Sequence, residues 1–115
     1  MLLLLALAAA PAPKYKAPPK PPPVVVSSLE SAQLARACDG RDDDPSPSFC
    51  TGYILGVFDA LSLAHQICPS PTKASTLTAI AAARKALRTH PDRWDSAPSF
   101  IVRDALKAAF PCTRR

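Results

Sequence analysis

The sequence predicts an all-α fold: a small, disulfide-stapled bundle of about four helices around a central buried helix at about residues 49–68. Three observations support this class. The stretch 49–68 is almost entirely apolar, apolar residues recur at helical spacing after residue 28, and no useful period-two alternation predicts a strand. Four cysteines are available to crosslink a core that would otherwise be marginal in a domain spanning residues 28–115.

The first ten residues are predicted to be a signal peptide. Residues 2–10 form a short apolar run, and Ala6–Ala8 or Ala8–Ala10 supplies a small-residue cleavage pattern. The run is too short to span a bilayer, so no membrane span is expected. The predicted location is the periplasm, reached by secretion, where disulfides form and persist.

Residues 11–27 are predicted to be a linker rich in proline and lysine. Proline is frequent enough there to prevent a helix, so the backbone should adopt an extended polyproline conformation. The linker carries three of the 14 basic residues. Residues 28–115 carry the other 11 together with all 9 acidic residues and are therefore nearly neutral. This balance does not favour a nucleic-acid binder.

The first helix should span residues 29–38, with Ser27 and Glu30 forming a capping box and Gly40 ending the helix. The acidic segment 39–47 follows as a loop. It lacks the order of an EF-hand calcium site, so no metal is expected. Ser48 is placed to cap the central helix.

The central helix should present one apolar face with a thiol at each end. A second line of small residues would let another helix approach closely, and so apolar a helix is expected to be buried on more than one side. The apolar face comprises Cys50, Tyr53, Ile54, Val57, Leu61, Ala64 and Cys68, and the small residues are Gly52, Gly56, Ala60 and Ala64.

Two further helices complete the predicted bundle. Thr72 or Ser75 should cap the third, which runs to residue 89 or 90, and Asp95 or Ser96 should cap the fourth, which runs to residue 110. In the third helix Arg84, Lys85 and Arg88 are interpreted as a basic, solvated outer side.

The cysteine positions favour one disulfide pattern. Cys50 and Cys68, 18 residues apart on one predicted helix, would lie roughly 27 Å apart and cannot bond. We favour Cys38 with Cys50 and Cys68 with Cys112. The alternative is Cys38 with Cys68 and Cys50 with Cys112. Zinc is disfavoured because the spacing contains no C-x-x-C pair.

The sequence also lacks the motifs of common enzymes. It contains no H-E-x-x-H, G-x-S-x-G or phosphate-binding loop, and its two histidines are 25 residues apart. With all four cysteines bridged, no thiol nucleophile would remain. We therefore expect a protein that is not an enzyme and needs no cofactor.

Several stretches together resemble the Rap/Tai immunity-protein family of type VI secretion. They are FCTGYILGVFD at 49–59, Ile67-Cys68-Pro69, His90-Pro91 and Phe110-Pro111-Cys112. The resemblance implies a periplasmic, disulfide-bonded helical protein, often a homodimer, that binds a peptidoglycan amidase effector and occludes its catalytic groove. The matching positions are interpreted as scaffold: Phe49, Gly52, Tyr53, Gly56, Asp59, Pro69, Pro91, Phe110 and Pro111.

Partner-contact residues are predicted from residue chemistry alone, in the two irregular loops. Asp42, Asp43 and Asp44 could meet a basic rim on a partner. Trp94, flanked by Arg93 and Asp95, could anchor an interface, because tryptophan and arginine are common anchors, or could fold back onto the core.

A second function class stays open at this point. The chain could be an exported envelope protein, structural or chaperone-like, that uses its basic proline-rich arm and has no effector partner. A proline-lysine arm reaching a surface would favour that reading, whereas a plain solvated spacer would not.

Overall fold

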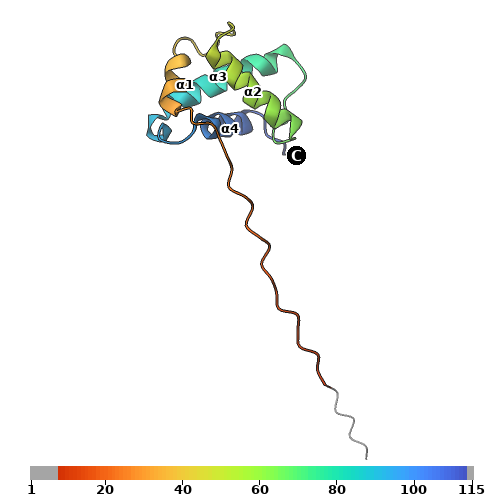
Figure 1. Ribbon diagram of the computed structural model, residues 1–115. Helices are drawn as coiled ribbons and strands as arrows, with labels where there is room; N and C mark the ends of the chain where they lie inside the picture. The colour runs from red at the N-terminus through yellow and green to blue at the C-terminus, as the bar shows by residue number, and fades with distance from the viewer. Residues whose placement is uncertain (1–7, 114–115) are drawn as a thin grey trace, which may run out of the picture.

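The computed structural model describes residues 8–113, and within this range it contains helices but no strand (Figure 1). The α-helices are α1 (Ser31–Ala37), α2 (Phe49–Leu63), α3 (Lys73–Thr89) and α4 (Pro98–Ala109), and a short 3₁₀ helix, η1 (Pro91–Arg93), links the last two. The predicted all-α class is confirmed.

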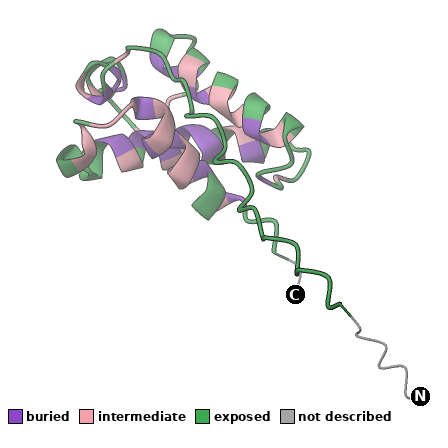
Figure 2. Cartoon of the chain, turned by 60° about the horizontal axis from the view of Figure 1, so that its bottom comes forward, coloured by how far each residue is buried: buried purple, intermediate pink, exposed green. Residues whose placement is uncertain are grey.

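The segment before α1 runs away from the helices as an extended chain (Figure 1). Residues 8–28 are all exposed and belong to no helix or strand (Figure 2). Most of the predicted signal peptide, residues 1–7, lies outside the described residues. The assignments of residues 1–10 and 11–27 therefore stay predictions.

Helix α1 begins later than its sequence pattern suggests. The capping box uses Glu30 and Gln33 in place of Ser27 and Glu30, with the Glu30 N–H donating to Gln33 Oε1 at 2.9 Å. The shift places Leu34 and Ser31 at fully buried positions, and the Ser31 hydroxyl donates to the carbonyl of Ser96. Packing against the turn before α4 therefore sets the start of α1.

Helix α2 begins as predicted but ends earlier. The Ser48 hydroxyl accepts a hydrogen bond from the Thr51 N–H at 3.1 Å. The predicted end near residue 68 is wrong, because His65 takes a left-handed conformation with φ of 55°. The His65 N–H then donates to the Ser62 carbonyl and the Gln66 N–H to the Leu61 carbonyl, which is the pattern of a Schellman motif.

This helix end turns the following segment back toward the core. Ile67 is buried, and the Cys68 N–H donates to the carbonyl of Phe110 at 3.0 Å. The chain after α2 is thereby tied to the chain after α4. Phe110 also packs edge-on against Phe58 of α2, with ring centroids 5.6 Å apart.

Helix α3 starts after Thr72, as predicted, whereas α4 starts later than predicted. Neither Asp95 nor Ser96 caps α4, because the Ser96 hydroxyl donates to the Arg93 carbonyl at 2.7 Å. The N-cap is Ala97 and Pro98 occupies the first turn. Proline suits that position because its missing N–H would have no partner there.

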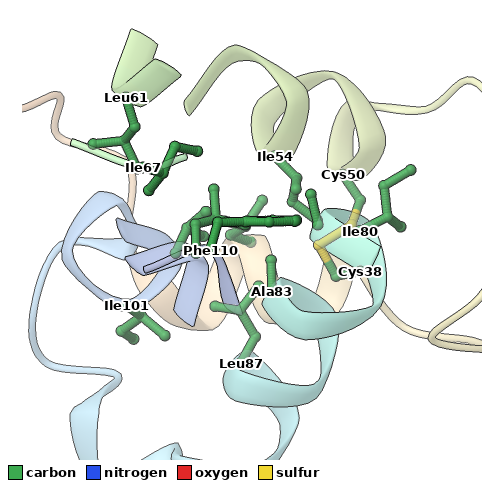
Figure 3. Packing of buried hydrophobic residues seen from close by; sticks show 14 residues of the cluster. Cys38, Cys50, Ile54, Leu61, Ile67, Ile80, Ala83, Leu87, Ile101 and Phe110 are labelled. Atoms are coloured by element: carbon green, nitrogen blue, oxygen red, sulfur yellow. A yellow bond between two sulfur atoms is a disulfide. The ribbon is translucent and has the colours of Figure 1, made fainter. Parts of the chain in front are cut away.

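The core lies where α2, α3 and α4 meet, with α1 closing one end (Figure 3). In this view Phe110 lies near the centre of the cluster with Ile54 above it, Ile80 lies beside the Cys38–Cys50 bridge, and Leu87 and Ile101 lie below. The buried hydrophobic residues are Leu34, Cys38, Cys50, Ile54, Leu61, Ile67, Ala79, Ile80, Ala83, Leu87, Ile101, Val102, Leu106 and Phe110.

Helix α2 packs against the other three α-helices but leaves one face exposed. Cys50, Ile54 and Leu61 lie in the core, but Phe49 is 61% exposed and Leu63 82% exposed. A Cβ atom added at Gly52 or Gly56 would meet nothing within 4 Å. The expected close approach of another helix along this line does not occur among residues 8–113.

Both disulfides follow the favoured pairing. Cys38 bonds Cys50, joining the end of α1 to the start of α2, and Cys68 bonds Cys112, joining the segments after α2 and α4. The sulfurs of the first bridge lie among core residues (Figure 3), whereas the cysteines of the second are exposed. The argument that excluded Cys50 with Cys68 assumed one continuous helix, which the structure does not contain.

We expect the double variant Cys68→Ala/Cys112→Ala to lose about 4 kcal/mol of unfolding free energy. The bridge closes a separation of 44 residues, and the cost of restricting so long a loop falls on the unfolded chain. Both cysteines are exposed, so the substitution leaves no core cavity. Urea unfolding followed by circular dichroism measures the loss, and a change below about 1 kcal/mol would contradict the crosslink's role.

Candidate functional site

The acidic loop between α1 and α2 is held by a buried arginine. Arg84 of α3 is only 5% exposed, and its Nη1 donates to the backbone carbonyls of Cys38 at 3.2 Å and Arg41 at 3.1 Å. A longer contact of 3.5 Å reaches the Asp39 carbonyl. One guanidinium group thus satisfies carbonyls at the end of α1 and across the turn after it.

Two of the three consecutive aspartates also brace this loop. Asp42 accepts both terminal nitrogens of Arg88, one of them at 2.9 Å, and this pairing lowers the pKa of the Asp42 carboxyl. Asp44 accepts the Ser46 N–H at 2.9 Å, and hydrogen bonds from Ser46 lower its pKa. Asp43 is exposed, and among the described residues its ion pair is with the exposed Arg41 at 3.4 Å.

The turn after α3 is fixed by the side chains of Trp94 and Arg93. The Trp94 indole N–H donates to the Leu87 carbonyl at 2.8 Å, and the half-buried ring packs against the core. Arg93 Nη2 donates to Asp104 of α4 at 2.9 Å. Asp95 is exposed. Trp94 therefore folds back onto the core, which was one of the two alternatives predicted for it.

The two irregular loops lie at the same end of the molecule. A cavity of about 430 Å³ separates them, with Asp39 and Gly40 on one side and Trp94 on the other. Figure 1 shows α1 and the turn after α3 at this common end. The complete lining is Ala35, Arg36, Cys38, Asp39, Gly40, Arg84, Leu87, Arg88 and Trp94.

Arg84 is the residue that sequence reasoning misplaced. It was assigned with Lys85 and Arg88 to a solvated outer side, but it is buried while those two are exposed. Arg84 follows Ile80 by four residues and precedes Leu87 by three, so it shares the buried face with them. This helical register could have predicted from the sequence that Arg84 is buried. A buried arginine needs hydrogen-bond acceptors within the protein.

The positions interpreted as scaffold differ widely in burial. Phe110 is buried, and Tyr53 is half-buried, which raises the pKa of its phenol. Asp59 is exposed. Pro91 opens η1. The exposed members are Phe49, Gly52, Gly56, Asp59, Pro91 and Pro111, and Pro69 is intermediate.

Residues 8–113 contain no free cysteine and no group of three or more His, Cys, Asp or Glu side chains that could hold a metal ion. None of the helices in this part of the chain has both the length and the apolar character needed to cross a membrane. His65 and His90 lie apart, the first ending α2 and the second ending α3.

The fold and the braced end define a class: a small, disulfide-crosslinked helical protein that presents two fixed loops on either side of a cavity. Comparison with protein families matches residues 30–112 to the model of the Rap1a immunity proteins. The chain belongs to this family, whose members are inhibitors and not enzymes, and membership implies a cognate effector of type VI secretion. Neither curated proteins nor solved structures gave a match.

We expect Asp42→Asn to destabilise the fold at pH 7, because the variant loses the ionic pairing with Arg88. The folded-state pKa of Asp42 lies below its unfolded value, so the pairing stabilises fully above an ordinary carboxyl pKa of about 3.9. That contribution is lost as the pH falls through the lower, folded pKa. The difference between the wild type and the variant should therefore shrink in acid.

Thermal unfolding at pH 7, 5, 3 and 2 measures this difference. The matched control is Asp43→Asn, which removes an exposed carboxylate with only a weak contact in the same loop. Equal effects of the two substitutions at pH 7 would show that Arg88 does not brace the loop through Asp42.

Proposed function

We propose that this chain is a periplasmic immunity protein that binds and sterically inhibits a peptidoglycan amidase effector of type VI secretion. Family membership supports inhibition of an effector. The observation that carries the rest is the bracing of the acidic loop by Arg84 and Arg88 beside the Trp94 turn. A fixed projecting edge of this kind suits insertion into a catalytic groove.

Bracing matters because an inhibitor loses affinity when its contact loop must become ordered on binding. Side-chain and loop ordering costs roughly 0.5–1.5 kcal/mol for each flexible side chain that is immobilised. Here the Cys38–Cys50 bridge, the Arg84 hydrogen bonds and the Asp42–Arg88 pair fix the loop before a partner arrives. Occlusion then needs no chemical step from the inhibitor.

The proposed contact residues fall into two groups, according to whether they already make an ion pair or hydrogen bond within the chain. Asp42 and Arg93 are engaged in ion pairs within the chain, and Asp44 accepts a hydrogen bond from its own loop. Asp43 and Asp95 are exposed and can approach a basic rim. We therefore assign the direct electrostatic contacts to Asp43 and Asp95, with the Trp94 turn giving the edge its shape.

The proposed periplasmic location is supported by the two disulfides, since such crosslinks persist in oxidising compartments. A signal peptide in residues 1–10 would deliver the chain there. The exposed proline-rich segment would then act as a spacer between the cleavage site and the helical domain.

We expect Asp43→Arg/Asp95→Arg to weaken inhibition of the cognate amidase about tenfold, because like charges would face a basic rim. Both residues are exposed, so the fold should persist. The measurement is hydrolysis of peptidoglycan fragments by the cognate amidase, at increasing inhibitor concentrations.

The control is Lys107→Glu, a charge reversal on the exposed side of α4, outside both loops and outside the exposed face of α2. Unchanged inhibition by that variant would locate the contact at the loops. Undiminished hydrolysis with the wild-type chain would refute inhibition itself. Loss of inhibition by Lys107→Glu alone would move the contact to α4.

We further propose that the chain forms a homodimer through the exposed face of α2. The face joins Phe49 and Leu63 with the open positions Gly52 and Gly56, so a second helix could approach the backbone closely. Asp59 is the one charged residue in α2. An apolar surface of this kind is typical of a contact between subunits.

We expect Gly56→Arg to convert a dimer to a monomer, because a long charged side chain would stand between the two helices. Within one chain the added atoms meet open space, so the monomer should remain folded. Sedimentation equilibrium measures the mass. A wild-type chain that stays monomeric at about 100 μM would contradict the dimer, and Lys85→Glu, on the exposed side of α3, is the control.

A further inference from the structure

The cavity between the two loops has an uneven charge distribution. Arg36, from the last turn of α1, and Arg84, from α3, both line it. Arg88 also lines it but is already paired with Asp42. The one carboxylate on the wall is that of Asp39, which accepts the Gly40 N–H at 3.0 Å. Two cations without an ion-pair partner among the described residues therefore share the cavity.

The guanidinium of Arg84 is only partly satisfied. All of its hydrogen bonds to the described residues come from Nη1, and all go to neutral carbonyls. Its Nε is buried and has no partner in residues 8–113. Nη2 makes no hydrogen bond to the described residues either and is not among the fully buried atoms, so it is the Arg84 nitrogen left to meet a ligand.

A buried cation without an anionic partner is costly, and an anion beside it would relieve the cost. A carboxylate suits this arrangement because its charged oxygens can accept hydrogen bonds from Arg84 Nη2 and from Arg36. Arg36 would supply a second positive charge at the rim. The Trp94 ring, fixed through its bond to the Leu87 carbonyl, offers an apolar wall for the carbon atoms of a ligand.

We propose that this cavity is a binding site for a small carboxylate, held by Arg84 and Arg36 against Trp94. Its volume of about 430 Å³ lies within the range of roughly 300–1,000 Å³ typical of small-molecule sites. The ligand is either a free carboxylic acid or the carboxyl end of a short peptide. The site needs no amidase, so the proposal stands or falls independently of inhibition.

Trp94 is the only tryptophan in the chain, so intrinsic fluorescence reports on the cavity directly. The experiment titrates the full oxidised chain with glutarate, with neutral glutaramide as the control, at constant ionic strength set by sodium chloride. A second arm uses trialanine with a free or an amidated carboxyl terminus. We expect a saturable change with the carboxylates and none with the neutral analogues.

The two arms separate the sources of the carboxylate. Saturation by glutarate indicates a free acid, and saturation by trialanine alone indicates a peptide end. Either result supports the site. No saturable change with either compound up to about 50 mM, or equal responses to the neutral analogues, would overturn it.

Variants test which residues hold the ligand. Arg36→Gln should weaken binding at least fivefold, because it removes the rim charge, and Arg36 is exposed, so the fold should be kept. Lys107→Gln, which removes an exposed charge on α4, should leave binding unchanged. Equal affinities for these two variants would overturn the assignment of Arg36.

Arg84→Met should abolish binding. Because it also removes the bonds to the acidic loop, circular dichroism must accompany it, and Arg36→Gln keeps the test valid if Arg84→Met unfolds. A folded Arg84→Met variant that binds glutarate as the wild type does would overturn the proposal.

Discussion

The end of the molecule that carries the acidic loop between α1 and α2 depends on one constraint, the Cys38–Cys50 bridge. It joins the last residues of α1 to the first turn of α2, so the acidic segment between them must close as a loop within a fixed span. Closure brings several backbone carbonyls over α3, where Arg84 meets them. Covalent closure and one buried cation thereby give a polar loop a defined shape without a helix or strand of its own.

The fold was largely predictable because its main signals are local. Ser48 and Thr72 precede their helices as expected, and the favoured disulfide pairing is the one observed, although the helix assumed to separate Cys50 from Cys68 ends at Leu63. The end of α2 was not predictable from propensity, since the left-handed residue is His65 and not a glycine. Likewise, Pro98 displaced Ser96 as the start of α4 because Ser96 bonds within its own turn.

The sequence predicted which loops form the candidate site, but not the cavity between them or the side chains that hold them. The two irregular loops were identified from composition, yet nothing local indicated that a cavity would bring Gly40 and Trp94 together. Arg84 was misassigned because charge was weighed above helical register. The exposed face of α2 was not predicted, because its residues are apolar and apolar residues are usually buried. In the structure one face of α2 stays exposed.

The two disulfides differ in solvent exposure, so a thiol reductant should reduce them at different rates. Exchange requires access to sulfur, and Cys68 and Cys112 are exposed whereas Cys50 is fully covered. The outer bridge should open first, freeing the C-terminal tail. The Cys38–Cys50 bridge, and with it the end of the molecule that carries the acidic loop, should stay intact longer. Reduction should therefore unfold the molecule in a fixed order.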